Sequence, residues 1–268
     1  MRSIVKILSC AVLVCALGGA AQAADGVLLV TRTTTTGSEA RTNQVQIEPK
    51  RMRAESSGAT GEKMIVLFDG TKQVMRLIDN EKKTYTEMTK EDVDALGGQM
   101  SAMMAQMEQQ LKSLPPEQRA QVEAMMKGRG MGAGAAVAPK VQYKKVGTDT
   151  VGKWTCDKYE GYTDGKKTNE VCTMEPKALG FTASDFDITR ELAAFFTKLM
   201  PANAAQLFSI GTGGEQGFSG IPVKSVATVG GRQVTTEVTE VSRQAFPDAI
   251  FQVPAGYQKQ SLMGRGRK

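Results

Sequence analysis

The stretch KMIVLFDGTKQVMRLIDNEKKTYTEMT, residues 63 to 89, contains three short apolar segments separated by turn residues. The segments are Lys63–Asp69, Gln73–Asp79 and Lys83–Thr89. Valine, isoleucine, threonine and aromatic side chains favour strands, and the Asp-Gly and Asp-Asn dipeptides between them favour tight turns. Strands this short, joined by turns this tight, predict an antiparallel meander.

Comparable segments occur on both sides of this stretch. Each is a short run rich in strand-forming residues and bounded by turn residues. The further predicted strands are Gly26–Thr34, Thr42–Glu48, Lys50–Ser56, Val141–Gly147, Ile221–Val229, Gln233–Ser242 and Ala249–Pro254. Together they predict a mainly β protein with helical insertions, in which one face of the sheet is buried and the other is wet.

Two helical insertions interrupt the predicted strands, and the C-terminal one covers residues 184–208. Ser184 is placed to cap its first turn, which carries two aspartates. Pro201 stops the helical pattern. The apolar residues that recur at helical spacing are Ile188, Leu192, Phe195, Phe196 and Leu199. Such an amphipathic helix needs an apolar surface to lie on, and a curved sheet offers one.

The other insertion is predicted at 99–127 as a hairpin of two helices. Gly97-Gly98 should end any earlier helix, because each glycine costs about 1 kcal/mol relative to alanine. A helix over Gln99–Ser113 is then broken by Pro115-Pro116. A second helix follows and ends at Gly128, so the hairpin is loosely tethered to the strands around it.

The apolar side of this hairpin is rich in methionine. Its residues are Met100, Met103, Met104, Met107, Leu111, Val122, Met125 and Met126. Methionine side chains are unbranched and suit surfaces that accept variable apolar partners, so a mobile lid or ligand-contact surface is one interpretation. Ordinary packing in the core is the second interpretation. Thioethers that collect Cu(I) are the third.

The N-terminal residues 1–23 are predicted to be a signal peptide. A basic start precedes the apolar run Ile7–Leu17, which is too short to span a bilayer, and Ala21-Gln22-Ala23 supplies a small-x-small cleavage site. Cleavage after Ala23 would release a periplasmic protein. The alternative is a lipoprotein signal in which Cys10 or Cys15 is lipidated.

The formal net charge of +6 is concentrated at the two ends of the chain. Removal of Arg2 and Lys6 leaves +4, since 6 − 2 = 4, and Arg265, Arg267 and Lys268 carry three of those charges. The body, 24–257, is therefore nearly neutral and is predicted to be a single domain that binds no nucleic acid. Residues 258–268 are predicted to be a basic, disordered tail that contacts anionic membrane peripherally.

Two cysteines remain after signal removal, Cys156 and Cys172. They flank Thr163-Asp164-Gly165, which predicts a hairpin with a three-residue turn. Pairing outward from that turn sets the two cysteines opposite each other, within the reach of a disulfide. An exported chain meets an oxidising compartment, where such a bond persists. The alternatives are a redox-active pair and a two-thiolate metal site.

The chain contains no histidine, which excludes several chemistries. Ser-His-Asp and Cys-His nucleophile systems, histidine general bases and most zinc or iron sites need that residue. The glycine-rich segment at 211–217, GTGGEQG, lacks the Lys-Ser/Thr ending of a phosphate loop. We therefore expect no enzyme activity, no cofactor and no catalytic or metal residues of the usual kinds.

Several segments together resemble a known family. They are the opening stretch up to Met88, LPPEQRAQVEAMM at 114–126, VGKWTCDKYEG at 151–161, NEVC at 169–172 and the segment 221–257. The chain resembles a family of exported bacterial proteins described only as a domain of unknown function. That family in turn is similar to the lipoprotein-localisation carriers of the periplasm. The resemblance implies a curved antiparallel half-barrel closed by helices, with an apolar cavity that accepts acyl chains in the carriers.

The function expected from these observations is that of an exported, non-enzymatic binding or carrier module. Its ligand would be apolar, such as a lipid, an acyl chain or a lipoprotein, and the protein would act as a monomer. Two alternatives remain open: a Met-rich periplasmic copper-binding protein, and a structural envelope protein with no small ligand.

Overall fold

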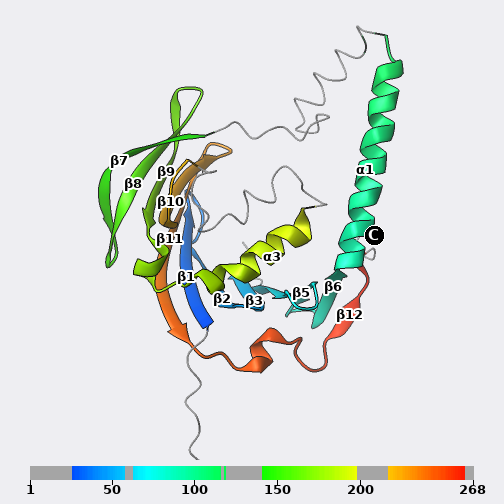
Figure 1. Ribbon diagram of the computed structural model, residues 1–268, viewed down its shortest axis with the longest axis horizontal. Helices are drawn as coiled ribbons and strands as arrows, with labels where there is room; N and C mark the ends of the chain where they lie inside the picture. Colours follow the sequence, from blue (N-terminus) through cyan, green and yellow to red (C-terminus); the bar gives the residue numbers. More distant parts are fainter. Residues whose placement is uncertain (1–25, 58–62, 116–117, 119–140, 198–216, 263–268) are drawn as a thin grey trace, which may run out of the picture.

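The computed structural model describes residues 26–57, 63–115, 118, 141–197 and 217–262 of the chain. A single sheet of twelve strands dominates this part of the chain (Figure 1). The strands are β1 (Gly26–Thr35), β2 (Arg41–Glu48), β3 (Arg51–Ser57), β4 (Lys63–Asp69), β5 (Val74–Asp79), β6 (Thr84–Thr89), β7 (Gln142–Val151), β8 (Trp154–Thr163), β9 (Lys166–Met174), β10 (Ile221–Val229), β11 (Arg232–Gln244) and β12 (Gln258–Gln260). Two α-helices, α1 (Lys90–Ser113) and α3 (Asp187–Phe196), and three 3₁₀ helices, η1 (Pro176–Leu179), η2 (Ala183–Phe186) and η3 (Asp248–Phe251), complete the described elements.

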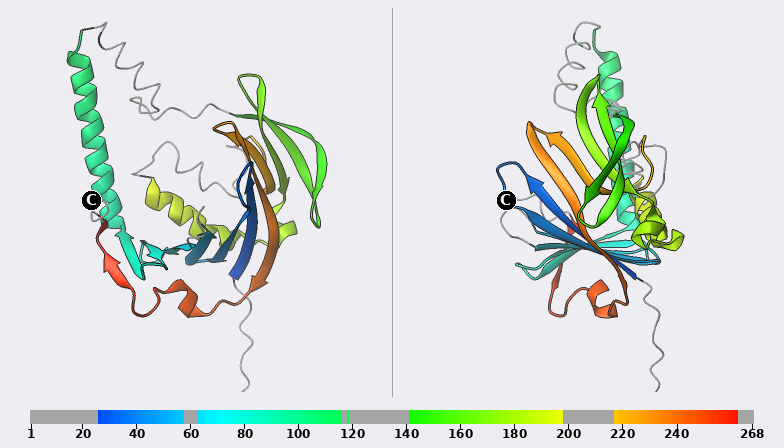
Figure 2. Two further views of the ribbon diagram at one scale, coloured as in Figure 1. Left: turned by 180° about the vertical axis from the view of Figure 1, so that it is seen from behind. Right: turned by 90° about the vertical axis from the view of Figure 1, so that its left-hand side faces the viewer.

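The strand order shows how the predicted meander is assembled. It is β12-β6-β5-β4-β3-β2-β1-β11-β10-β9-β8-β7, and every pairing is antiparallel except that of β12 with β6. The strands β1 to β6 form one meander and β7 to β11 a second, joined by the β1–β11 pair. The sheet curves strongly but does not close, because its end strands β12 and β7 do not pair with each other (Figures 1 and 2). The predicted mainly β, half-barrel class is therefore confirmed.

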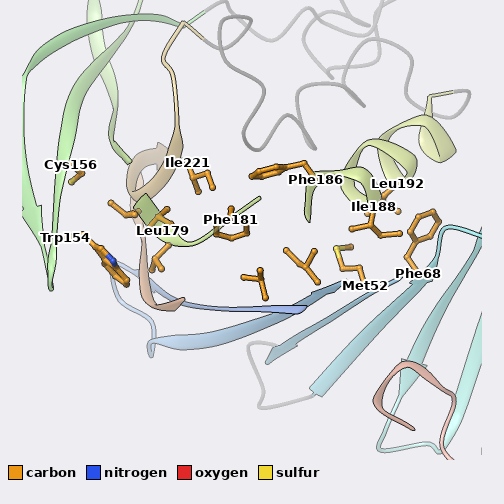
Figure 3. Close-up of a cluster of buried hydrophobic side chains, with 14 of the residues drawn as sticks. Met52, Phe68, Trp154, Cys156, Leu179, Phe181, Phe186, Ile188, Leu192 and Ile221 are labelled. Atoms are coloured by element: carbon orange, nitrogen blue, oxygen red, sulfur yellow. The ribbon is translucent and has the colours of Figure 1, made fainter. Parts of the chain in front are cut away.

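The hydrophobic core lies where α3 and its neighbours cover the concave side of this sheet (Figure 3). Alternate residues of β1 to β5 point into it, among them Val27, Ile47, Met52, Phe68 and Met75. A smaller cluster occupies the opposite face of β4 and β5, where the segment after η3 supplies Val253 and Tyr257. The strands β4 and β5 are thus covered on both faces, which explains their nearly continuous apolar sequence.

Most predicted strands lie within one or two residues of their observed positions, but Ala249–Pro254 is not a strand. The chain forms η3 at Asp248–Phe251 instead. Pro247 lacks an N–H and suits the start of such a turn, and the turn brings Phe251 beneath Arg51, whose guanidinium carbon lies 4.2 Å from the ring centroid. An ion pair of 2.7 Å between Arg51 and Asp248 holds the same turn in place.

The prediction that Gly97-Gly98 ends a helix was wrong, and so was the predicted start at residue 99. The helix α1 begins at Lys90 and continues through both glycines to Ser113. Thr89 and Asp92 form a reciprocal capping box at its start, and Val93 is buried in the core. These contributions outweigh a glycine cost of about 1 kcal/mol each. The predicted second helix of the hairpin, which includes Val122, falls on residues of which only 118 is described.

The C-terminal insertion is helical as predicted, but it begins differently. Thr182, rather than Ser184, forms the capping box, together with Asp185, and η2 leads directly into α3. Ile188, Leu192 and Phe195 are buried as their spacing predicted. The described helix ends at Phe196, and residues 198–216, which include Leu199 and Pro201, lie outside the described residues.

The predicted tail at 258–268 begins with a strand. Residues Gln258–Gln260 form β12, which pairs in parallel with β6, and Lys259 forms an ion pair of 2.7 Å with Glu87. The backbone N–H groups at this sheet edge need partners, which a short added strand supplies. Residues 263–268 and the predicted signal peptide lie outside the described residues.

The cysteine hairpin has a different register from the predicted one. Asp164 and Gly165 both have positive φ angles, 49° and 75°, so the turn has two residues instead of three. A bulge follows between Gly161 and Tyr162, and Cys172 lies opposite Lys158. The two cysteines are diagonal neighbours with Cα atoms 5.5 Å apart, and they form the predicted disulfide.

Candidate functional site

The candidate site is built around α3, which lies along the concave side of the sheet (Figures 1 and 3). Ile188, Leu192 and Phe195 face the strands at helical spacing and are almost fully buried. The ring of Phe195 meets that of Phe68 on β4 edge-on, with centroids 5.4 Å apart. The helix therefore forms an apolar second layer over the sheet, as its amphipathic pattern predicted.

The start of this layer is fixed by a buried carboxylate. The side chain of Asp185 accepts hydrogen bonds from the backbone N–H of Thr182, at 2.6 Å, and from its hydroxyl, at 2.9 Å. Arg243 on β11 donates two further bonds to the same carboxylate, at 2.8 and 3.2 Å. Because Asp185 is buried, these partners offset the cost of removing its charge from water. The pair positions η2, and through it α3, over the sheet.

The apolar surface continues beyond α3 into an open groove at the end of β4 and β5. Its lining is Lys63, Met64, Leu77, Ile78, Asp79, Glu81 and Lys82. Leu77 also packs against the core cluster, and Met64 is 48% exposed. The cavity volume is small, about 50 Å³. An apolar floor with two cations and two carboxylates at its rim is able to hold a short apolar segment next to a polar group. We refer to this lining as the Met64–Leu77 groove.

The helix α1 rises from the far end of the sheet and borders the same concave side, opposite β7 and β8 (Figures 1 and 2). It contacts β6 and α3, and its first turn buries Val93 in the core. Beyond this turn Met100, Met103 and Met104 are 49%, 69% and 44% exposed. A run of exposed methionines on one helix is unusual, since such side chains are normally buried.

The predicted site residues thus separate into four groups, of which the exposed methionines are the first. Met107 is half-buried and Leu111 is buried, unlike the three exposed methionines that precede them on α1. Val122, Met125 and Met126 lie outside the described residues. The disulfide cysteines Cys156 and Cys172 are buried far along the sheet, near η1 and not at the Met64–Leu77 groove.

The charged groups of the described residues form ion pairs and small networks. Glu87 on β6 accepts hydrogen bonds from Lys259, at 2.7 Å, and from Arg76, at 2.7 Å. The hydrogen bond from Lys259, followed by that from Arg76, holds the pKa of the Glu87 carboxyl below its ordinary value. Within the described ranges, no group of three or more Asp, Glu, Cys or His residues is placed to hold a metal ion.

Two features of the site were missed in the sequence. The Asp185–Arg243 pair joins residues 58 positions apart, and nothing local links them. The Thr182-x-x-Asp185 pattern was readable as a capping box, and it would have corrected the start of the helix. The Met64–Leu77 groove was also missed, because only the three-dimensional register of β4 and β5 brings its residues together.

Comparison with known families gives one match. A family model described as Domain of unknown function (DUF4412) matches residues 87–257, which is more than half of the 268 residues. The family resemblance predicted from the sequence is therefore confirmed. The matched range begins within β6 and ends just before β12. No curated protein matches the chain in sequence.

Solved structures with a similar chain path share little sequence with it. An uncharacterized conserved protein from Thermus thermophilus is 9% identical over 89% of this chain and 91% of that chain, with a TM-score of 0.43. A LolA superfamily protein from Nitrosomonas europaea is 8% identical over 85% and 89%, with a TM-score of 0.29. A putative outer membrane lipoprotein-sorting protein domain from Vibrio parahaemolyticus is 5% identical over 86% and 91%, with a TM-score of 0.26. Among the described helices, none is both long and apolar enough to cross a membrane.

Proposed function

Because the chain belongs to the family described as Domain of unknown function (DUF4412), whose description assigns no activity, we propose a function from the geometry of the described residues. The protein is an exported, non-enzymatic carrier or binding module for an apolar ligand in the cell envelope. The ligand is a lipid, an acyl chain or the acyl portion of a lipoprotein.

The observation that carries this proposal is the continuity between the core and the Met64–Leu77 groove. The apolar face covered by α3 extends past the helix to Leu77 and then to the exposed Met64. Each methylene that an acyl chain buries there contributes about 0.8 kcal/mol. Lys63 and Lys82 at the rim are balanced by Asp79 and Glu81, so the rim suits a polar end group without net charge.

The exposed methionines of α1 support the same proposal. Met100, Met103 and Met104 form an adaptable apolar surface that borders the concave side. In the proposed mechanism they are the lid, together with Met107 and Leu111 and with Val122, Met125 and Met126 farther along. The lid repacks around the ligand and keeps water from its apolar part.

The proposed location is the periplasm, reached with the signal peptide 1–23 and cleavage after Ala23. The disulfide between Cys156 and Cys172 supports this location, because such bonds persist in oxidising compartments and are rare in the cytosol.

A second candidate function is the binding of Cu(I), and one observation favours it. Met100, Met103 and Met104 follow i, i+3, i+4 spacing on one side of α1, and their thioethers are accessible. Soft thioether ligands select Cu(I). Titration of the whole protein with Cu(I), monitored by native mass spectrometry, separates this function from the carrier function.

The test of the carrier function uses the mature protein purified from the periplasm. Native mass spectrometry and analysis of an organic extract should find a co-purifying lipid. Met64→Asp should lower the bound fraction and the binding of an apolar fluorescent probe by at least tenfold. Val146→Asp is the matched control, because Val146 is 50% exposed and also lies on a strand but does not line the Met64–Leu77 groove. The proposal is rejected if no lipid co-purifies with the protein and if Met64→Asp and Val146→Asp bind the probe equally well.

A further inference from the structure

A second pocket lies at the other end of the sheet, beside the disulfide, and the proposed carrier function does not use it. Its cavity volume is about 260 Å³. The lining is Thr148, Thr155, Cys156, Asp157, Thr173, Met174, Glu175, Ala178 and Ser219. Four of these side chains carry hydroxyls and two carry carboxylates, so the lining combines hydrogen-bonding groups with the apolar surface of Cys156, Met174 and Ala178.

Three of the lining residues form a row across neighbouring strands. Thr148 on β7 lies opposite Asp157 on β8, and Asp157 lies opposite Thr173 on β9. Directly opposed residues of antiparallel strands project to the same face, at about 5 Å intervals. The row therefore presents hydroxyl, carboxylate and hydroxyl in a line. Such a line matches a small molecule with several hydrogen-bonding groups.

The walls of this pocket are held by contacts that do not depend on a ligand. The disulfide ties β8 to β9 behind the row. The ring of Phe218 meets that of Tyr143 edge-on, with centroids 4.9 Å apart, and this contact holds Ser219 over the strands. Gly220 has a φ of 88°, and a Cβ there would come within 2.6 Å of the Met174 carbonyl oxygen. The pocket is thus formed in advance, which lowers the entropy cost of binding.

The charges of the lining select the sign of the ligand. Lys145 donates a hydrogen bond of 2.6 Å to Asp157, so that carboxylate is neutralised in part. Within the described ranges, no lysine or arginine forms an ion pair with Glu175, the second carboxylate of the lining. The lining itself contains no cation. An anionic ligand is therefore disfavoured, and an ammonium group would gain a charge-assisted hydrogen bond at Glu175.

We propose that this pocket binds a small hydroxylated ammonium compound, such as an amino alcohol or an amino sugar. The ammonium group donates to Glu175, and the hydroxyls bond to the row of Thr148, Asp157 and Thr173. The same chemistry occurs in a free amino alcohol and in an ethanolamine lipid headgroup.

Titration of the isotopically labelled mature protein, followed by backbone amide NMR, tests the proposal with defined probes. These are glucosamine, ethanolamine, short-chain dihexanoyl phosphatidylethanolamine and, as the neutral comparison, glucose. Glucosamine should bind at least about tenfold more tightly than glucose, with shifts at Thr148, Asp157 and Thr173, because only it forms the charge-assisted bond. Amide shifts with glucosamine or ethanolamine would indicate that the ligand is a free amine. Shifts with the short-chain lipid alone would indicate that it is a lipid headgroup.

Variants separate the pocket from non-specific attraction. Glu175→Gln should remove the preference for glucosamine over glucose, and Thr173→Val should weaken both sugars. Glu39→Gln is the control, because Glu39 is exposed in a loop outside the pocket and the variant changes the net charge equally. The proposal is overturned by shifts that occur elsewhere, by an equal effect of Glu39→Gln, or by no response to any amine at tens of millimolar.

Discussion

The carboxylate of Asp185 and the guanidinium of Arg243 form a two-point ion pair that joins the start of α3 to β11, with N–O distances of 2.8 and 3.2 Å. The aspartate side chain has no exposed surface, whereas the arginine is one-third exposed. The pair connects the helical layer to the second meander. Asp185 belongs to η2, which precedes α3, and Arg243 belongs to β11, which lies between β10 and β1 in the sheet.

Replacing this carboxylate should be costly. Asp185→Ala leaves the Thr182 N–H and the Arg243 guanidinium without their acceptor, and removing one partner of a buried ion pair costs about 3–5 kcal/mol. Because Arg243 retains some access to water, we expect about 2–3 kcal/mol in chemical denaturation. The control is Asp187→Ala, two residues after Asp185. It breaks only the exposed ion pair with Arg190 and should cost less than about 1 kcal/mol. Equal costs for both variants would contradict the assigned role of Asp185.

The disulfide should stabilise the fold without taking part in any reaction. Cys156 and Cys172 enclose a loop with a sequence separation of 16, for which the chain-entropy model gives about 3 kcal/mol. Reduction, or the double substitution to serine, should lower the free energy of unfolding by about that amount. Thiol labelling of denatured, unreduced periplasmic protein should detect no free thiol. Two labelled thiols per chain would show that the pair is reduced in the cell.

Gly70 and Glu191 should show a coupled effect on the seating of α3. A Cβ at Gly70 would overlap the Oε2 atom of Glu191 and lie 2.8 Å from the Cδ1 atom of the buried Ile188. Overpacking of this kind costs about 1–3 kcal/mol, so Gly70→Ala should destabilise by that amount.

The same Oε2 atom is buried and has no hydrogen-bond partner in the described part of the chain. Glu191→Ala should therefore be neutral or stabilising, and it should rescue part of the Gly70→Ala loss. A double-mutant cycle should give a coupling of at least about 0.5 kcal/mol. Strictly additive effects would show that the two side chains do not share this space.

Acid should detach β12 from the sheet. The pKa of Glu87 is lowered by its hydrogen bonds from Lys259 and Arg76. A carboxyl group with a lower pKa in the folded state stabilises that state above its unfolded pKa, and the contribution disappears as the pH falls through the folded pKa. The amide of Gln258 donates to the Lys83 carbonyl at 3.0 Å, and its protection factor against hydrogen exchange should fall below about pH 4. Glu87→Gln should lower this protection factor already at pH 7 and leave it nearly independent of pH over the same range.

The strands were more predictable from the sequence than the helical parts, for a physical reason. Alternation and turn residues are local signals, and they located β4 within its observed bounds of Lys63–Asp69. The path of α1 through Gly97-Gly98 depends on the burial of Val93 against elements elsewhere in the chain, which outweighs local helix propensity.

The candidate site was harder to predict because its parts are distant in sequence. The methionine pattern predicts a lid or ligand-contact surface on the helix, which stays a prediction, and it contained no signal for the groove at Met64 and Leu77. The disulfide was predicted although its assumed register was two residues out. The reason is that two cysteines on neighbouring strands come close enough for a disulfide in either register. They do so when they lie directly opposite each other, and also when they lie diagonally, as Cys156 and Cys172 do.

The methionine face of α1 should act as a lid that depends on bending near Gly97-Gly98. Gly98 has open space around it, so Gly98→Ala should fit without a clash and stabilise the helix by about 0.5–1 kcal/mol. If α1 must bend there to bring Met100, Met103 and Met104 toward the Met64–Leu77 groove, the stiffer helix should slow both uptake and release of an apolar probe.

The matched control is Ser101→Ala. Ser101 is exposed on the same helix, and alanine favours the helix there too, but both glycines remain, so probe kinetics should not change. Deleting residues 98–134 and bridging the gap with a short Gly-Ser linker gives the complementary test. Since the deletion keeps Val93, the residue of α1 that packs in the main core, we expect cooperative melting near the parent temperature with altered probe binding. Loss of the folded state on deletion would show instead that the methionines are core.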